Sequence, residues 1–79
     1  MPEYHEEFRV GETVVIADRA ALERFRAEWK LHHPLTKGQL EFAGEEGRVA
    51  DVSFYHGGDV LYELDGIPGI WHECCLRHP

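Results

Sequence analysis

The stretch from Gly47 to Trp71, GRVADVSFYHGGDVLYELDGIPGIW, constrains the fold most, because strand periodicity and turn chemistry agree there over three successive segments. Residues 49–54 are rich in β-branched and aromatic residues, and the glycine pair that follows permits the positive φ of a tight hairpin. Residues 60–65 alternate, so that Tyr62 and Leu64 share one face. We therefore expect a three-stranded meander whose middle strand points these two side chains into a core.

Two irregularities are predicted in this meander. Val49 and Val52 do not follow strict alternation, which indicates a bulge near Ala50–Asp51 that lets both valines face inward. The segment Gly66–Gly69 contains Pro68 and should break the run, because proline has a fixed φ and glycine a free one. Extended structure should then resume over residues 70–73.

A strand and a helix are predicted before the meander. Residues 13–17, TVVIA, have the composition of a short strand, and Asp18 is a good N-cap for a helix over residues 19–31. The helix carries one apolar stripe, formed by Leu22, Phe25 and Trp29. We expect this stripe to pack on the sheet, close one open end of a barrel and place Trp29 in the core.

A second, short helix is predicted over residues 37–43. Thr36 and Gln39 have the spacing of a capping box, and Gly44 suits the left-handed residue that ends a helix. Pro34 disfavours helical backbone at the residue before it, so the first helix should end near Leu31.

The whole pattern resembles a small SH3-like barrel, mainly β, with four to five antiparallel strands and both helices between the first two strands. Within that group it is similar to the barrel domain of the nitrile hydratase β-subunit and its accessory proteins. The residues that carry this resemblance are Phe8, Gly11, Glu12, Val14, His33, Pro34, Gly44, Gly47, Val49, Leu61, Tyr62, Leu64 and Trp71. A second resemblance, to KOW, Tudor and mind-bomb-type barrels, rests on the same glycine–valine spacing.

The resemblance implies a binding module rather than a self-sufficient enzyme. In the nitrile hydratase family the barrel packs against a catalytic α-subunit that holds iron or cobalt through a cysteine cluster, and this chain has no such cluster. It also has the sequence HPLTK over residues 33–37, where the family has a His-Thr-Arg-like stretch. Two functions therefore stay open: a non-catalytic protein-interaction module, or a β-subunit-like or accessory component of a separate metalloenzyme.

Length and charge restrict the partners. A chain of 79 residues is long enough for one domain, expected over residues 8–79 after a flexible lead over residues 1–7. The net charge of −7 disfavours nucleic acid and anionic membrane surfaces, and favours a partner with a basic surface. No secretory signal is recognised, so we expect a cytoplasmic protein with free thiols at Cys74 and Cys75, whose adjacency disfavours a disulfide.

The candidate partner-binding residues lie around the turns of the meander. Tyr55, His56, Tyr62 and Trp71 could line a groove of the kind in which small barrels hold peptides. Tryptophan is common both in cores and at interfaces, so the sequence leaves open whether Trp71 is buried or exposed.

No catalytic residue or cofactor is predicted, because the chain has no recognisable nucleophile-and-base pair. His72, Cys74, Cys75 and His78 are the alternative metal ligands, but their spacing departs from known zinc motifs, and we expect no stoichiometric metal. His32, His33 and His56 form a second histidine group, which would converge if the end of the first helix lay over the hairpin.

Overall fold

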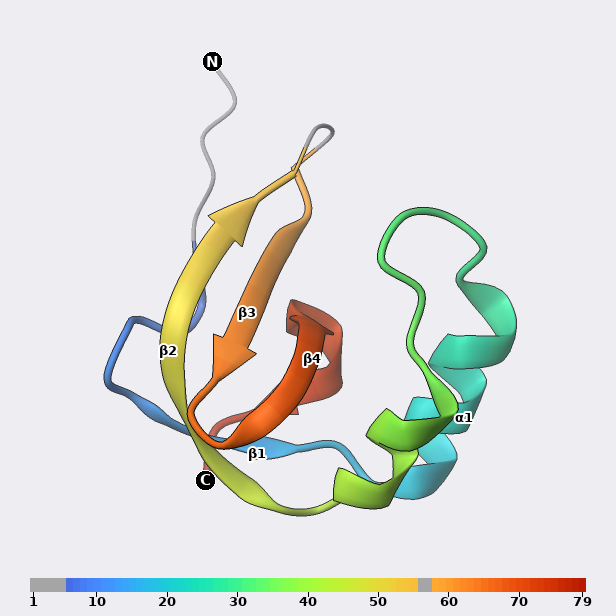
Figure 1. The fold of residues 1–79 in the computed structure, drawn as a ribbon, viewed down its shortest axis with the longest axis horizontal. Helices are drawn as coiled ribbons and strands as arrows, with labels where there is room; N and C mark the ends of the chain where they lie inside the picture. The colour runs from blue at the N-terminus through green and yellow to red at the C-terminus, as the bar shows by residue number, and fades with distance from the viewer. Residues whose placement is uncertain (1–5, 56–57) are drawn as a thin grey trace.

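The computed structural model of the protein describes residues 6–55 and 58–79, which form a single antiparallel sheet with helical segments beside it (Figure 1). The elements are β1 Thr13–Ile16, α1 Arg19–Glu28, η1 Lys37–Phe42, β2 Glu46–Phe54, β3 Val60–Leu64, β4 Ile67–His72, η2 Glu73–Cys75 and β5 Leu76–Arg77. The sheet order is β4-β3-β2-β1-β5. The curled sheet forms a half-barrel, with α1 and the 3-10 helix η1 between β1 and β2, which confirms the predicted fold class. No helix in the described ranges is long and apolar enough to cross a membrane.

The meander has the predicted bulge and a tighter second turn than predicted. The β2–β3 register shifts between Val49 and Asp51, as expected. The segment around Pro68 does not break the run, because β4 already begins at Ile67 and the turn is confined to Asp65 and Gly66, whose φ is +73°. Proline is tolerated in β4 because this strand lies at the edge of the sheet, where a missing N–H removes no ladder bond.

The helix α1 ends three residues before the predicted Leu31. Asp18 caps its N-terminus as predicted, accepting a hydrogen bond from the Ala21 N–H at 2.8 Å. The chain leaves the helix at Trp29, whose backbone is extended, with φ −86° and ψ 115°. The cause is tertiary: the residues that follow turn back towards the sheet, and the Trp29 indole binds one of them.

The second helix has both hydrogen bonds of the predicted capping box, yet it is a 3-10 helix that ends at Phe42. Thr36 accepts from the Gln39 N–H at 3.3 Å, and the Gln39 side chain accepts from the Thr36 N–H at 2.9 Å. Gly44, with φ +81°, turns the chain after this helix, and its N–H donates to the Ile16 carbonyl.

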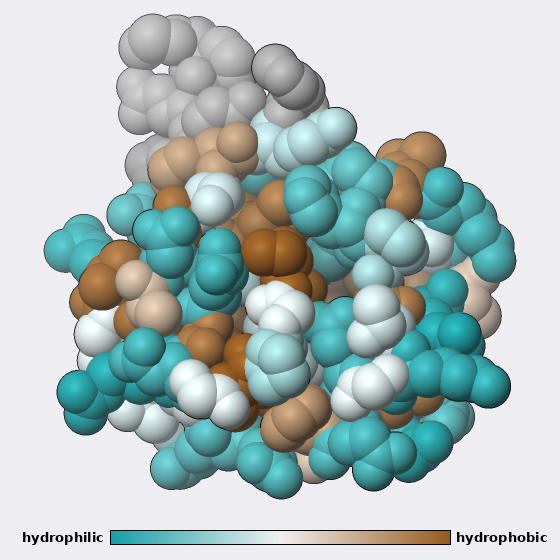
Figure 2. Space-filling view, viewed as in Figure 1, coloured by the Kyte–Doolittle hydropathy of each residue, from teal (hydrophilic) through white to brown (hydrophobic). Residues whose placement is uncertain are grey.

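The core lies inside the curl of the sheet. Its largest fully buried side chains are Trp71, Tyr62, Phe8, Ile16, Leu22, Val14 and Val49. Trp71 is thus a core residue, which decides the alternative that the sequence left open. Figure 2 shows apolar side chains near the middle of one face, between hydrophilic ones, and further apolar side chains at the left and upper right of the view.

Candidate functional site

The segment between α1 and η1 crosses to the β2–β3 hairpin and makes specific contacts there. The His32 ring stacks on Tyr55 with centroids 3.7 Å apart, and its Nε2 lies 2.8 Å from Asp59 Oδ2. His32 therefore meets the hairpin, and the His33 ring lies 5.5 Å from the Tyr55 ring between centroids. His56, the third histidine of that group, lies outside the described residues.

The backbone turns sharply at His33, whose φ of 49° is in the left-handed region. Two hydrogen bonds hold this turn: Trp29 Nε1 donates to the His32 carbonyl at 2.6 Å, and His72 Nε2 donates to the His33 carbonyl at 2.8 Å. We call residues 32 and 33 the histidine turn. Its side chains face each other, with the two Nδ1 atoms 3.0 Å apart.

His72 connects the histidine turn to the sheet. Its side chain is buried, with the rings of Phe25 and Trp29 each 4.9 Å from it between centroids. Burial lowers the pKa of His72, and the neighbouring His32 and His33 lower it further, against an opposing effect of the His33 carbonyl and Asp59. His72 is thus a neutral hydrogen-bond donor that positions the turn.

The histidine turn borders an apolar groove of about 450 Å³ between η1 and the edge strand β4. We call it the η1–β4 groove; it is lined by His33, Pro34, Thr36, Gly38, Gln39, Phe42, Pro68, Gly69 and Ile70. The two elements lie side by side in Figure 1, with β4 in orange and η1 in green.

Gln39 joins the two walls of this groove. Its side-chain amide accepts from the Thr36 N–H and donates to the Ile70 carbonyl at 2.9 Å, so the capping residue also binds the sheet edge. Gly69 permits this approach, because a Cβ there would lie 2.7 Å from Gln39 Nε2. These hydrogen bonds therefore fix η1 and β4 relative to each other on the two sides of the groove.

The predicted partner-binding residues do not form one exposed surface. Tyr62 and Trp71 are both 0% exposed, so neither can contact a partner in this structure. Their burial follows from register: they are paired across β3 and β4 and share the face that points into the curl. Tyr55 is half-buried against the histidine turn, and His56 is not described.

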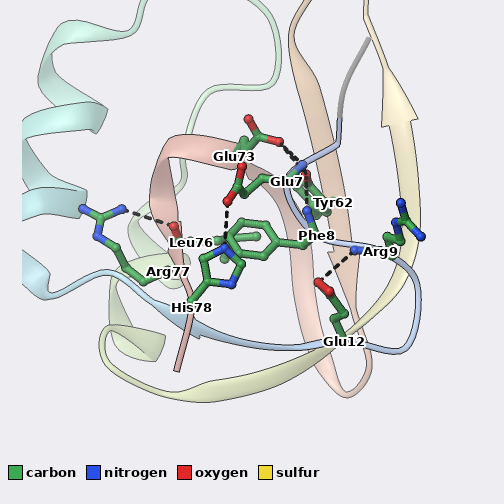
Figure 3. Close-up of polar contacts among 9 residues, drawn as sticks. All are labelled: Glu7, Phe8, Arg9, Glu12, Tyr62, Glu73, Leu76, Arg77 and His78. Carbon is green, nitrogen blue, oxygen red and sulfur yellow. Dashed lines mark hydrogen bonds and ion pairs between the residues drawn. The ribbon is translucent and has the colours of Figure 1, made fainter.

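Tyr62 instead belongs to a polar cluster where distant parts of the chain meet (Figure 3). Its hydroxyl donates to Glu73 Oε2 at 2.6 Å and accepts from the Glu7 N–H at 3.1 Å. His78 Nε2 lies 2.7 Å from a Glu7 carboxylate oxygen, and the His78 ring packs on Phe8. Burial and the Glu73 carboxylate raise the pKa of Tyr62, so the phenol stays protonated.

The alternative metal ligands do not come together. His72 points to the histidine turn and His78 to Glu7, while Cys75 is buried and Cys74 exposed. Across the described ranges, no set of three or more His, Cys, Asp and Glu side chains could hold a metal ion. A hydrogen bond from Cys75 lowers the pKa of Cys74 to about 7, and the same contact together with burial raises the pKa of Cys75.

Sequence reasoning missed most of the groove. No local signal marks Pro34, Phe42, Pro68 and Ile70 as one surface, because they come from two segments at least 26 residues apart that only the sheet edge brings together. The capping box did identify Gln39, although not its bond to β4.

A scan of protein-family models and searches of curated proteins and solved structures found no match to the chain.

Proposed function

We propose that the protein is a non-catalytic interaction module that binds an extended protein segment in the η1–β4 groove. The observation that carries this proposal is the groove itself, an apolar depression with walls from Phe42, Pro68 and Ile70 beside the exposed edge of the sheet. Apolar clefts with a few placed polar groups are the usual sites of ligand recognition.

The partner would bind by placing side chains in the groove rather than by adding a strand to the sheet. Strand addition needs free N–H and C=O groups along an edge. In β4 the edge is blunted, because Pro68 has no N–H and Gln39 already occupies the Ile70 carbonyl. Side-chain recognition is the mode that remains for this edge.

Charge favours a basic partner. The chain carries a net charge of −7, and a second depression, which shares Pro68 and Gly69 with the groove, has the exposed Glu63 on its rim. A segment with an apolar residue flanked by Lys or Arg would place its charge towards Glu63. The same net charge opposes binding of nucleic acid.

Selection of random peptides on the immobilised protein tests this proposal. We expect enrichment of apolar residues flanked by Lys or Arg, with affinity that falls as salt rises. Gly38→Gln should weaken binding of a selected peptide at least about tenfold, because the new side chain enters a groove in which a Cβ meets nothing closer than 3.9 Å.

Ala20→Gln on the exposed face of α1 is the matched control and should leave the affinity unchanged. Equal affinities of wild type and Gly38→Gln, with both variants folded, would place any binding elsewhere. Failure to enrich any peptide would count against the proposal as a whole.

The β-subunit-like or accessory role in a separate metalloenzyme is the second candidate, and a pull-down from the native host distinguishes it. Its support is the sequence resemblance, but Phe8, Val14, Val49 and Trp71, which carry much of it, are core residues. Such positions maintain a barrel and carry little information about a partner. Recovery of a cysteine-rich metal-binding subunit would nevertheless favour this role over a peptide-binding one.

A further inference from the structure

The side chains of the histidine turn are brought together by an unusual backbone conformation. Successive side chains of an extended chain point in opposite directions, so adjacent histidines ordinarily diverge. Here the left-handed φ of 49° at His33 brings the two Nδ1 atoms to 3.0 Å from each other.

This conformation is maintained from outside the turn. A non-glycine residue with positive φ is uncommon and persists when its surroundings determine it. The indole of Trp29 and the imidazole of His72 supply that constraint by donating to the His32 and His33 carbonyls. The facing nitrogens are therefore a built feature of the fold rather than a chance approach of two surface rings.

Asp59 orients the first of the two rings. Its carboxylate accepts the Nε2–H of His32, so the Nδ1 of the neutral ring carries a lone pair that points at His33. The His32 side chain is only 15% exposed, which limits its rotation. A carboxylate behind a histidine in this way is the arrangement that orients metal-bound histidines in proteins.

We propose that His32 Nδ1 and His33 Nδ1 are the two protein ligands of a labile site for a late first-row divalent cation such as zinc. Two Zn–N bonds of about 2.0–2.1 Å at a tetrahedral angle separate their nitrogens by about 3.3–3.4 Å. The two Nδ1 atoms would therefore have to move apart by only about 0.3–0.4 Å to bind the metal. Imidazole nitrogen is a preferred ligand of zinc and copper.

Water supplies the remaining ligands from the side of His33, which is exposed. Asp59 acts as a positioning residue through His32. The proton between the two nitrogens moves through solvent to Nε2 of His33 when the metal binds. With only two protein ligands the site is weak, which agrees with the expectation that the purified protein holds no stoichiometric metal. The site does not require the η1–β4 groove to bind anything.

Titration of the untagged full chain with zinc chloride, followed by calorimetry and by nitrogen NMR of the histidine rings, tests the site. We expect one zinc per chain and resonance changes at the Nδ1 atoms of His32 and His33. His33→Asn should raise the dissociation constant at least about tenfold, since asparagine tolerates the left-handed backbone but lacks the ring. His78→Asn, at an exposed histidine held by Glu7, is the control and should bind as wild type does.

The role of Asp59 is tested by Asp59→Asn. The amide can still accept the His32 N–H, but more weakly than a carboxylate, so the zinc dissociation constant should rise by about tenfold. The tautomer signature of His32 should change while resonances elsewhere stay in place, a result that a merely structural role would not produce. If His32 kept its wild-type tautomer populations in Asp59→Asn, Asp59 would not be a positioning residue of the site.

Three outcomes would overturn the site itself. The first is no binding at millimolar zinc. The second is unchanged binding in both His33→Asn and His32→Asn. The third is binding that is lost in Cys74→Ser but kept in the histidine variants, which would assign the metal to the thiols.

Discussion

Single buried polar residues set much of the chemistry of this fold, and His72 is the clearest case. It lies in an apolar setting between Phe25 and Trp29, yet its Nε2 donates a hydrogen bond that holds the histidine turn. Because burial opposes its protonation, the unfolded chain takes up a proton at this residue more readily than the folded chain does. Stability is therefore linked to pH through this side chain.

The free energy of unfolding should fall as the pH drops below about 6.5, the ordinary pKa of histidine. The sign follows from the lowered pKa in the folded state: unfolding takes up a proton in this window, so acid favours the unfolded chain. His72→Gln, whose amide can still donate to the His33 carbonyl, should show a smaller loss between pH 7 and 5 in denaturant melts.

His78→Gln is the control for this experiment, because His78 is exposed and contacts a different part of the chain. It should retain the wild-type loss of stability in acid. If His72→Gln also lost as much stability in acid as the wild type does, other groups, above all the carboxylates, would account for the pH dependence.

At the scale of elements, α1 contributes to the core through its beginning and to the site through its end. Leu22 is completely buried, whereas Phe25 and Trp29 are half-buried and pack on each other and on His72. Trp29 was expected in the core; it lies instead at the helix C-cap, because its indole reaches the His32 carbonyl. The apolar stripe is therefore divided between two roles.

This division predicts an order of stability losses that denaturant melts can measure. Leu22→Ala should cost about 2–5 kcal/mol, as for a buried leucine. Trp29→Ala should cost less, about 1–3 kcal/mol, because a half-buried ring and one hydrogen bond are lost, and the protein should stay folded. Arg26→Ala, on the exposed face, should change stability by less than ~0.5 kcal/mol.

The reverse order for Leu22 and Trp29 would show that the tryptophan is a core anchor after all. A loss of zinc binding in Trp29→Ala without unfolding would be the further sign that the end of α1 serves the histidine turn.

At the scale of the whole molecule, the polar cluster around Tyr62 joins residues from both ends of the described chain. Glu7 and Glu73, 66 residues apart, are hydrogen-bonded to each other and to the Tyr62 hydroxyl. The hydroxyl also accepts from the Phe8 N–H at 3.3 Å. Phe8 is a core residue, so this cluster positions the segment that covers one side of the core.

Tyr62→Phe removes the centre of the cluster while it keeps the buried ring. The free energy of unfolding should fall by about 1–3 kcal/mol, because the Phe8 N–H loses its partner inside the protein. Hydrogen exchange at that amide should accelerate more than exchange in β3. Ser53→Ala, at an exposed position of β2, is the control, and a loss no larger than the control's would show that the cluster adds no stability.

The sequence by itself determined the features that depend on neighbouring residues. The β3 alternation, the bulge after Val49, the Asp18 cap and the capping box of Thr36 and Gln39 were all predicted, because each is marked by residue types and spacings within a few positions of the chain. Such a pattern can be recognised without knowing where the segment lies in the fold. The strand and turn patterns in the same way indicated a mainly β chain with a helical insertion, whereas the barrel was implied by the resemblance.

Only the tertiary structure decided where the candidate sites are. The bond from Gln39 to Ile70 spans 31 residues and that from His32 to Asp59 spans 27, and neither has a sequence pattern. Whether Trp71 faces a partner or the core depended on the direction in which the sheet curls, which places that face inside. The η1–β4 groove and the histidine turn form because the curl of the sheet brings a sheet edge, a helix end and a hairpin close together. Local sequence preferences do not determine this long-range arrangement.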